Sequence, residues 1–145
     1  MRFQCSDVEL DRRAIRRDLR RGLRAAGLPD AEISLLFVDD EQMRSLNLEY
    51  RGISRTTDVL AFPQNDGLLQ SPSSDEGPPL ILGDIVISLP TARRQCSRYS
   101  HSIDAEIRRL MAHGIAHLFG HDHKHPLRAR KMRAFERDLL KAMNS

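Results

Sequence analysis

The 145-residue sequence is poor in aromatic residues, with no tryptophan, two tyrosines and five phenylalanines. Proteins that bind single-stranded nucleic acid without sequence preference stack successive bases on several aromatic rings, so this composition argues against an extended stacking platform. The sequence also has no apolar run close to the roughly 20 residues that cross a bilayer. No apolar signal-peptide core follows its first residues. We therefore expect a soluble, cytoplasmic protein that makes no use of a membrane.

Cysteine is scarce as well, because Cys5 and Cys96 are the only two and form no C-x-x-C pair. Isolated thiols in a chain without a signal peptide indicate reduced, buried cysteines of a cytosolic protein. A length of 145 residues is sufficient for one domain with its own hydrophobic core. We expect a single domain over residues 1–145.

Lysine is the rare basic residue, since 20 of the 23 basic residues are arginines and the net charge is +3. Arginine binds phosphate well, although a bias in genome composition would give the same excess. A helix expected over about residues 7–26 carries a row of arginines opposite its apolar side: Arg13, Arg17, Arg20 and Arg24. Two interpretations stand. The row is a solvated helix face, which we favour as the commoner case, or a stripe that follows a phosphate backbone.

Strands and helices are expected to mix without strict alternation. The sequence indicates strands at residues 2–5, 33–38, 56–63 and 80–89, and helices at about residues 7–26, 39–51, 90–97, 102–118 and 126–143. The last two strands can form a hairpin. Residues 64–79, rich in Gly, Pro and Ser, predict a mobile loop between them. We expect an α+β fold in which helices cover a small sheet.

The strongest chemical signal is a cluster of histidines, five of the six lying between residues 113 and 125. His113 and His117 are four residues apart, so on a helix their rings share one face and can converge on one metal ion. Gly120 can take the left-handed conformation that ends a helix and lets the chain return with a third ligand. The spacing H-x3-H-x2-G-x2-H favours His123 as that ligand, with His121 as the next candidate.

Three histidines and a water form a zinc site of the open, catalytic type. Zinc in such a site lowers the pKa of its water to about 7 and polarises a substrate oxygen. In the H-E-x-x-H motif of zinc peptidases a glutamate follows the first histidine and serves as general base, whereas here that position is Gly114. We therefore expect a zinc hydrolase in which another acid, or the substrate, handles the proton. Three imidazoles also suit nickel or copper.

Three aspartates allow more than one role. Asp122 lies between two histidines, where it can act as a base or, as we favour, orient a ligand ring, the usual task of a carboxylate beside a metal-bound histidine. Asp58 and Asp84 can each cap a turn or hold a histidine. The sequence does not assign a general base to any of them.

Residues 113–123, HGIAHLFGHDH, resemble the signature H-G-x-x-H-L-x-G-[aromatic]-D-H of the bacterial YbeY family of rRNA maturation factors at every position but one. Upstream segments resemble other blocks of that family in the same order: LN at 46–47, YR at 50–51, TDVL at 57–60, FP at 62–63 and GDIVIS at 83–88. The chain departs from the family at His121, where tyrosine is usual, and at Ala61, where serine is usual.

The resemblance implies a zincin-like α+β domain with a four-stranded mixed sheet. It also implies a zinc-dependent endoribonuclease, specific for single strands, that acts in maturation of the 16S rRNA 3′ end and in ribosome quality control. By the same resemblance His113, His117 and His123 are the ligands of one zinc ion, Arg51 acts on the phosphate, and the partners are ribosomal RNA and the small ribosomal subunit with its associated proteins. Two alternatives stay open: a zinc hydrolase of another substrate, including peptides, and a ribosome-assembly factor with a mainly structural zinc.

Overall fold

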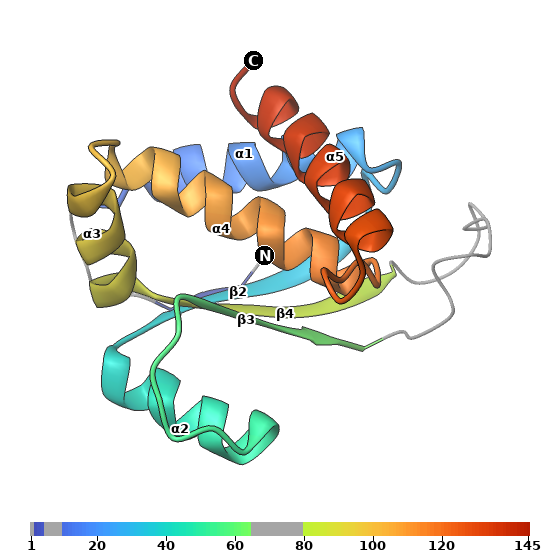
Figure 1. Cartoon of the computed structure of the whole chain (residues 1–145). Helices are drawn as coiled ribbons and strands as arrows, with labels where there is room; N and C mark the ends of the chain where they lie inside the picture. The colour runs from blue at the N-terminus through green and yellow to red at the C-terminus, as the bar shows by residue number, and fades with distance from the viewer. Residues whose placement is uncertain (1, 5–9, 65–79) are drawn as a thin grey trace.

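A mixed β-sheet forms the centre of the computed structural model, which describes residues 2–4, 10–64 and 80–145. Within these residues the sheet order is β1-β2-β4-β3 (Figure 1), with β1 (Arg2–Gln4), β2 (Glu32–Val38), β3 (Val59–Pro63) and β4 (Ile81–Ser88). The strands β1, β2 and β4 run parallel, and β3 pairs with β4 in the antiparallel direction. The hairpin expected from the sequence is therefore present. The α+β architecture is confirmed.

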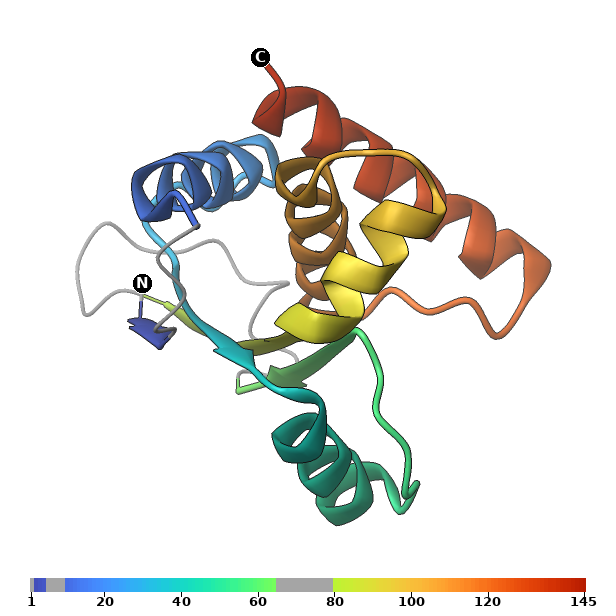
Figure 2. The ribbon, with the colours of Figure 1, turned by 90° about the vertical axis from the view of Figure 1, so that its left-hand side faces the viewer.

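Three helices cover one face of this sheet and a fourth lies against the other (Figures 1 and 2). The three are α1 (Arg12–Ala25), α4 (Ile103–Leu118) and α5 (Pro126–Met143), and α2 (Asp40–Arg51) lies alone on the opposite face. A further helix, α3 (Leu89–Arg98), leaves the end of β4 with Pro90 in its first turn, as the sequence predicts. No helix among the described residues is both long enough and apolar enough to cross a membrane.

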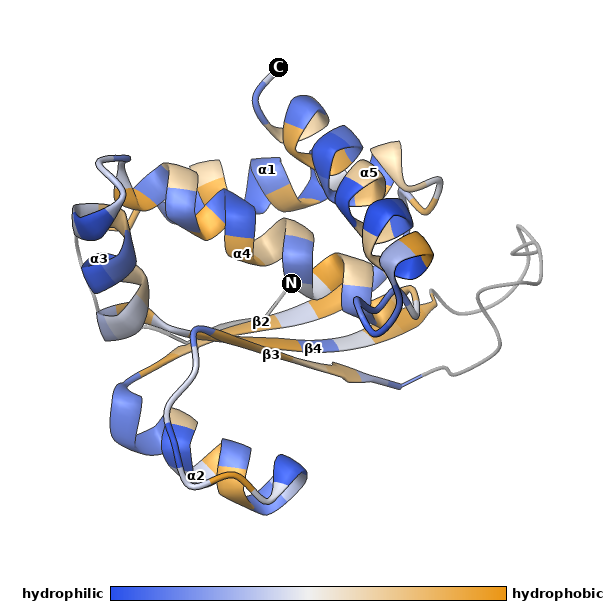
Figure 3. Ribbon diagram, in the orientation of Figure 1, coloured by the Kyte–Doolittle hydropathy of each residue, from blue (hydrophilic) through white to orange (hydrophobic). Residues whose placement is uncertain are grey.

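Two hydrophobic cores of different size follow from this layering. The larger core joins the apolar sides of α1, α4 and α5 to the sheet, through fully buried residues such as Leu35, Ile85 and Leu110. The smaller core, Met43, Leu60 and Val86, holds α2 on the other face. Hydropathy colouring shows the helices with apolar inner and polar outer sides (Figure 3), the pattern expected of helices with one face on a core.

Two sequence-based expectations need correction: the start of the first helix and the burial of Cys96. The helix begins at Arg12 because the side chain of Asp11 accepts a hydrogen bond from the Ala14 amide at 3.1 Å and caps it. Cys96 is half-buried rather than buried, and its thiol donates to the Arg93 carbonyl at 3.2 Å. Cys5 and nearly all of the predicted loop, residues 65–79, lie outside the described residues.

Candidate metal centre

The C-terminal end of α4 places the first two histidines and turns the chain back past them. Ser102 caps the start of the helix by accepting from the Ala105 amide at 3.0 Å. At the other end Gly120 has a φ of +86°. The Gly120 amide donates to the His117 carbonyl at 2.9 Å, and the His121 amide to the Ala116 carbonyl at 3.0 Å. These bonds form a Schellman turn, which confirms the helix ending expected at Gly120.

His113 and His117 lie side by side on α4, one helical turn apart. Their Nε2 atoms are 3.1 Å apart and their rings are nearly perpendicular, at 81°. Two nitrogens bound to one tetrahedral zinc at about 2.0–2.1 Å lie about 3.3 Å from each other. The observed distance suits a hydrogen bond between the rings, and it also suits two ligands of a single ion.

Glu136 of α5 fixes the orientation of the first of these rings. Its Oε1 atom lies 2.7 Å from Nδ1 of His113, and both side chains are largely shielded from solvent. A carboxylate can only accept, so the proton of the His113 ring is on Nδ1 and the lone pair of Nε2 faces His117. Carboxylates commonly hold metal-bound histidines in this way. Glu136 follows His113 by 23 residues, and nothing local in the sequence signals its role.

His117 is kept neutral by its surroundings. Burial is the largest cause that lowers the pKa of His117, and the neighbouring imidazoles of His113 and His123 lower it further by disfavouring a second charge beside them. Glu136 acts in the opposite direction, and Arg51 adds a smaller lowering effect. A neutral imidazole is the form that binds a metal ion, so the site keeps His117 available as a ligand near neutral pH.

Of the two candidates for a third ligand, His123 faces the pair and His121 does not. The ring centroid of His123 is 6.2 Å from that of His117, whereas the ring of His121 packs on Phe135 of α5 at 4.6 Å. As they stand, the described His, Cys, Asp and Glu side chains form no group of three that could hold a metal ion. The pair on α4 fits a metal, and a third histidine ligand requires the exposed His123 ring to turn toward it.

Gly114 faces the sheet rather than the histidines. A Cβ atom at this position would meet Cγ2 and Cδ1 of Ile85 at 2.9 and 3.0 Å, which is closer than real Cβ contacts. The helix α4 therefore packs so tightly on β4 that a side chain at this position would force Ile85 to shift. The position that carries glutamate in zinc peptidases is here turned toward the sheet and packed against Ile85.

Arg51 is brought to the site by α2. The helix starts at a capping box between Asp39 and Gln42, and it ends at Gly52, whose φ of +70° allows the chain to leave directly after Arg51. Arg51 is exposed, and its positive charge lies close enough to His117 to lower the pKa of that histidine, although by less than burial does. Arg51 and His117, 66 positions apart in the sequence, thus interact electrostatically in the fold.

Asp40 anchors the first turn of α2 to the elements around it. Oδ1 accepts hydrogen bonds from Ser88 and Thr91 at 2.6 Å each and from Thr56 at 3.2 Å, and Oδ2 lies 2.8 Å from Arg94. Burial alone would raise the pKa of Asp40, but these hydrogen bonds outweigh it and hold the pKa well below its usual range. The network joins α2 to α3 and to the chain before β3.

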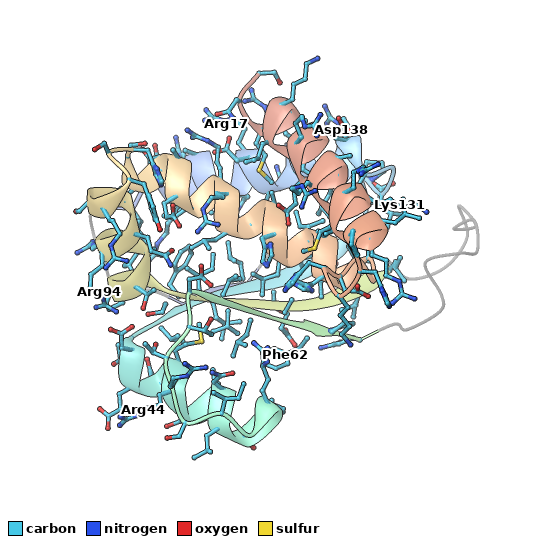
Figure 4. The ribbon with its side chains drawn as sticks, viewed as in Figure 1. Arg17, Arg44, Phe62, Arg94, Lys131 and Asp138 are labelled. Carbon is cyan, nitrogen blue, oxygen red and sulfur yellow. The ribbon has the colours of Figure 1, made fainter. Side chains whose placement is uncertain are left out.

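The neighbour of Arg51 on α2 is an exposed aromatic residue. The Tyr50 ring is 60% exposed and contacts Phe62 of β3 at a centroid distance of 4.9 Å. Phe62 projects from the sheet toward α2 (Figure 4). The Tyr50 ring is therefore held in place by Phe62 and remains largely exposed to solvent next to Arg51.

The three ambiguous aspartates cap turns or join ion pairs and contact no histidine. Asp122 accepts from the Lys124 amide at 3.0 Å, the main cause that lowers its pKa, and pairs with Arg128 at 3.4 Å. Asp58 accepts from the Val59 amide at 2.8 Å, and Asp84 from the Gln64 side chain at 3.0 Å. The expectation that Asp122 orients a ligand ring is not met, because its carboxylate bonds to Lys124 and Arg128, and the carboxylate that holds the His113 ring is that of Glu136.

Comparison with known proteins agrees with the motifs. The family model described as Endoribonuclease YbeY matches residues 2–144. A protein named Endoribonuclease YbeY from Desulforamulus reducens is 50% identical over 115 residues, 79% of this chain and 74% of that protein. Its namesake from an Anaeromyxobacter species is 47% identical over 120 residues, 83% of this chain and 58% of that longer protein.

A solved structure shares the fold. The solution structure of TM1509 from Thermotoga maritima matches with a TM-score of 0.65 over 98% of this chain and 87% of that chain. Its sequence identity of 19% supports the fold alone. The family model matches nearly the whole chain, and the two relatives named above are about 50% identical to it in sequence. Both findings confirm the family resemblance found in the motifs. The chain belongs to the YbeY family of endoribonucleases.

Proposed function

We propose that the chain is a zinc-dependent endoribonuclease that cleaves single-stranded RNA in the maturation of ribosomal RNA, with a zincin-like catalytic domain. In this proposal His113, His117 and His123 hold one zinc ion. Arg51 binds the scissile phosphate. The observation that supports it best is that two groups from distant parts of the chain act on one histidine pair: Glu136 orients His113, and the charge of Arg51 acts on His117.

A bound zinc ion would polarise a phosphate oxygen and supply a nucleophile at neutral pH. The protein's own groups then have separate tasks. Glu136 holds the His113 ring by its Nδ1 proton. The guanidinium of Arg51 presents donors to the non-bridging oxygens, where negative charge builds up as the phosphodiester reacts. The exposed ring of Tyr50, next to Arg51, offers a surface for one nucleobase, since stacking on an aromatic ring does not depend on the base.

Peptide hydrolysis is the weaker alternative because of Gly114. The peptidase mechanism needs a carboxylate directly after the first histidine; here that position is a glycine that faces Ile85 of the sheet, where a side chain would be crowded. A positive charge beside the histidines also suits a phosphodiester, which carries a negative charge, better than a neutral peptide bond. A role as a ribosome-assembly factor would use the same histidines without turnover.

The test is incubation of the purified, zinc-loaded chain with single-stranded RNA, the same RNA as a duplex, and a peptide panel. We expect cleavage of the single strand only, and loss of cleavage in Arg51→Ala and His117→Ala. Cleavage that survives both substitutions would indicate a contaminating ribonuclease, and peptide cleavage would support the peptidase alternative. Stable binding to small ribosomal subunits with no RNA cleavage would support the assembly factor and overturn the nuclease.

A further inference from the structure

The positive charge of the chain is concentrated on two helices. In α1 seven arginines accompany one acid, and in α5 six basic residues accompany two acids, so these helices carry +6 and +4. Because the whole chain carries +3, all its other residues together carry −7. A modest overall charge therefore conceals a strong separation of charge within the molecule.

The two basic helices are also neighbours in space. Their inner sides meet in the larger core, where Met143 approaches the backbone of α1 so closely that a Cβ on Gly22 would lie 2.7 Å from its Cε atom. Both helices lie on the side of the sheet opposite α2 (Figure 1). Their charges consequently add to one another over a single region of the surface.

The basic side chains point away from that core. Helical spacing puts one row of residues opposite the buried side of each helix, and the members of these rows are exposed: Arg13, Arg20 and Arg24 on α1, and Arg130, Arg137 and Lys141 on α5. We call these six residues the α1–α5 basic face. Figure 4 shows Arg17 and Lys131, further basic residues of the same two helices.

Acidic residues do not neutralise this face. Asp18 of α1 is buried, with 3% exposure, and lies near Arg17 and Arg108. Glu136 of α5 is turned inward onto His113, which leaves Asp138 as the exposed acid of the two helices. Among the described residues, none of the six members of the basic face forms an ion pair or a side-chain hydrogen bond, whereas Arg94, Arg109 and Arg128 are each paired with a carboxylate.

We infer that the α1–α5 basic face binds the sugar-phosphate backbone of RNA outside the cleavage site. Five of its six members are arginines, whose planar fork matches phosphate oxygens. The helix α5 contributes to both the histidine centre and the basic face. On its inner side Glu136 holds His113, while the next residue, Arg137, faces solvent. An RNA molecule that follows the face can therefore reach the histidines. The inference rests on RNA being the substrate, as proposed above.

The first test measures binding without turnover, using a fluorescein-labelled 20-nucleotide RNA in EDTA over a range of salt concentrations. The slope of log K against log salt is about −0.7 for each phosphate neutralised on a single strand. In the triple variant Arg13→Gln, Arg20→Gln and Arg24→Gln we expect the slope to become shallower by about 2, with at least tenfold weaker binding at about 0.1 M salt. The matched control is Arg44→Gln, Arg55→Gln and Arg98→Gln, which removes the same charge from exposed positions elsewhere.

Equal weakening in the two triple variants would mean that only net charge matters and would overturn the inference. An unchanged slope in the α1 variant, with loss of binding to polyglutamate, would assign the face to an acidic protein and would overturn it too. Thermal melting followed by circular dichroism checks that each variant is folded. If the wild type binds RNA through this face but cleaves none, the proposed nuclease activity fails and the binding surface stands.

Discussion

Nδ1 of His113 donates a hydrogen bond to Oε1 of Glu136 at 2.7 Å, across the contact between α4 and α5. This bond leaves Nε2 of His113 as an acceptor, 3.1 Å from Nε2 of His117. The relationship ties the chemistry of the site to the packing of two helices, since movement of α5 away from α4 would release the ring. A centre built in this way is oriented before any ion binds, which favours metal binding because less freedom is lost.

We expect that replacing Glu136 weakens zinc binding without removing one of the proposed ligands. Because a carboxylate beside a metal-bound histidine typically accounts for about 10–100-fold in affinity, we expect about tenfold for Glu136→Gln, whose carbonyl can still accept from Nδ1, and nearer 100-fold for Glu136→Leu. Competition with a fluorescent zinc chelator measures this. Asp138→Asn, on the exposed side of the same helix, is the matched control. Equal zinc affinity in Glu136→Leu and the wild type would show that the contact does not support the site.

Gly114 is required by packing. We expect Gly114→Ala to lower the free energy of unfolding by about 1–3 kcal/mol, the usual cost of overpacking, despite the higher helix propensity of alanine. Ile85→Ala removes all three side-chain atoms that the new methyl group would meet. In that background Gly114→Ala should be neutral or stabilising. Urea unfolding of the four proteins gives the coupling energy, and additive effects would argue against the contact.

Arg51 should act on turnover and leave zinc binding intact. We expect Arg51→Ala to lower kcat on single-stranded RNA by about 100–1,000-fold, the range found when a donor to transition-state charge is removed. Arg51→Lys should recover part of this loss, because it restores the charge but not the forked geometry. Zinc content measured by plasma mass spectrometry should equal that of the wild type. A variant that loses zinc together with activity would give Arg51 a structural role.

Asp40 should make stability depend on pH in the acid range. Its pKa is lower in the folded chain than in the unfolded chain. The folded state therefore binds fewer protons, and the stability contributed by Asp40 is complete above about pH 5 and is lost as the pH falls further. We expect Asp40→Asn to lower the free energy of unfolding by about 1–2 kcal/mol at pH 7.

The difference between Asp40→Asn and the wild type should shrink as the pH falls from about 5 to 2. Urea unfolding at several pH values measures it. Glu41→Gln, the exposed neighbour in the same turn, is the control and should leave the curve of the wild type unchanged. A difference that is constant across this range would show that protonation of Asp40 is not the cause.

Local patterns in the sequence predict what neighbouring residues determine. The i, i+4 spacing of His113 and His117, the cap at Ser102 and the turn at Gly120 each depend on a few consecutive residues, and the structure contains all three. The helix at the N-terminus was predicted to begin too early. The reason is that Asp11, the true cap, follows residues whose apolar spacing continues the same period.

Contacts between distant segments could not be predicted in this way. Nothing near Glu136 distinguishes it from any other acid on a charged helix, and Asp122, adjacent to a histidine in the sequence, was the more obvious choice. The same holds for the tight contact between Gly114 and Ile85 and for the packing of α1 on α5. Because α1 packs on α5, the arginines of α1 form part of a larger basic face and not an isolated stripe.

In the proposed function, the histidine centre and Arg51 together cleave RNA in a metal-dependent reaction. The most direct measurement is the rate of cleavage of a labelled single-stranded RNA by the chelator-stripped chain as zinc is added back, in the wild type and in His117→Ala. We expect that cleavage by the wild type rises with zinc and saturates near one ion per chain, while His117→Ala stays at background throughout. Cleavage by the stripped wild type that does not change as zinc is added, or equal cleavage by the zinc-loaded wild type and His117→Ala, would show that the reaction does not depend on this centre.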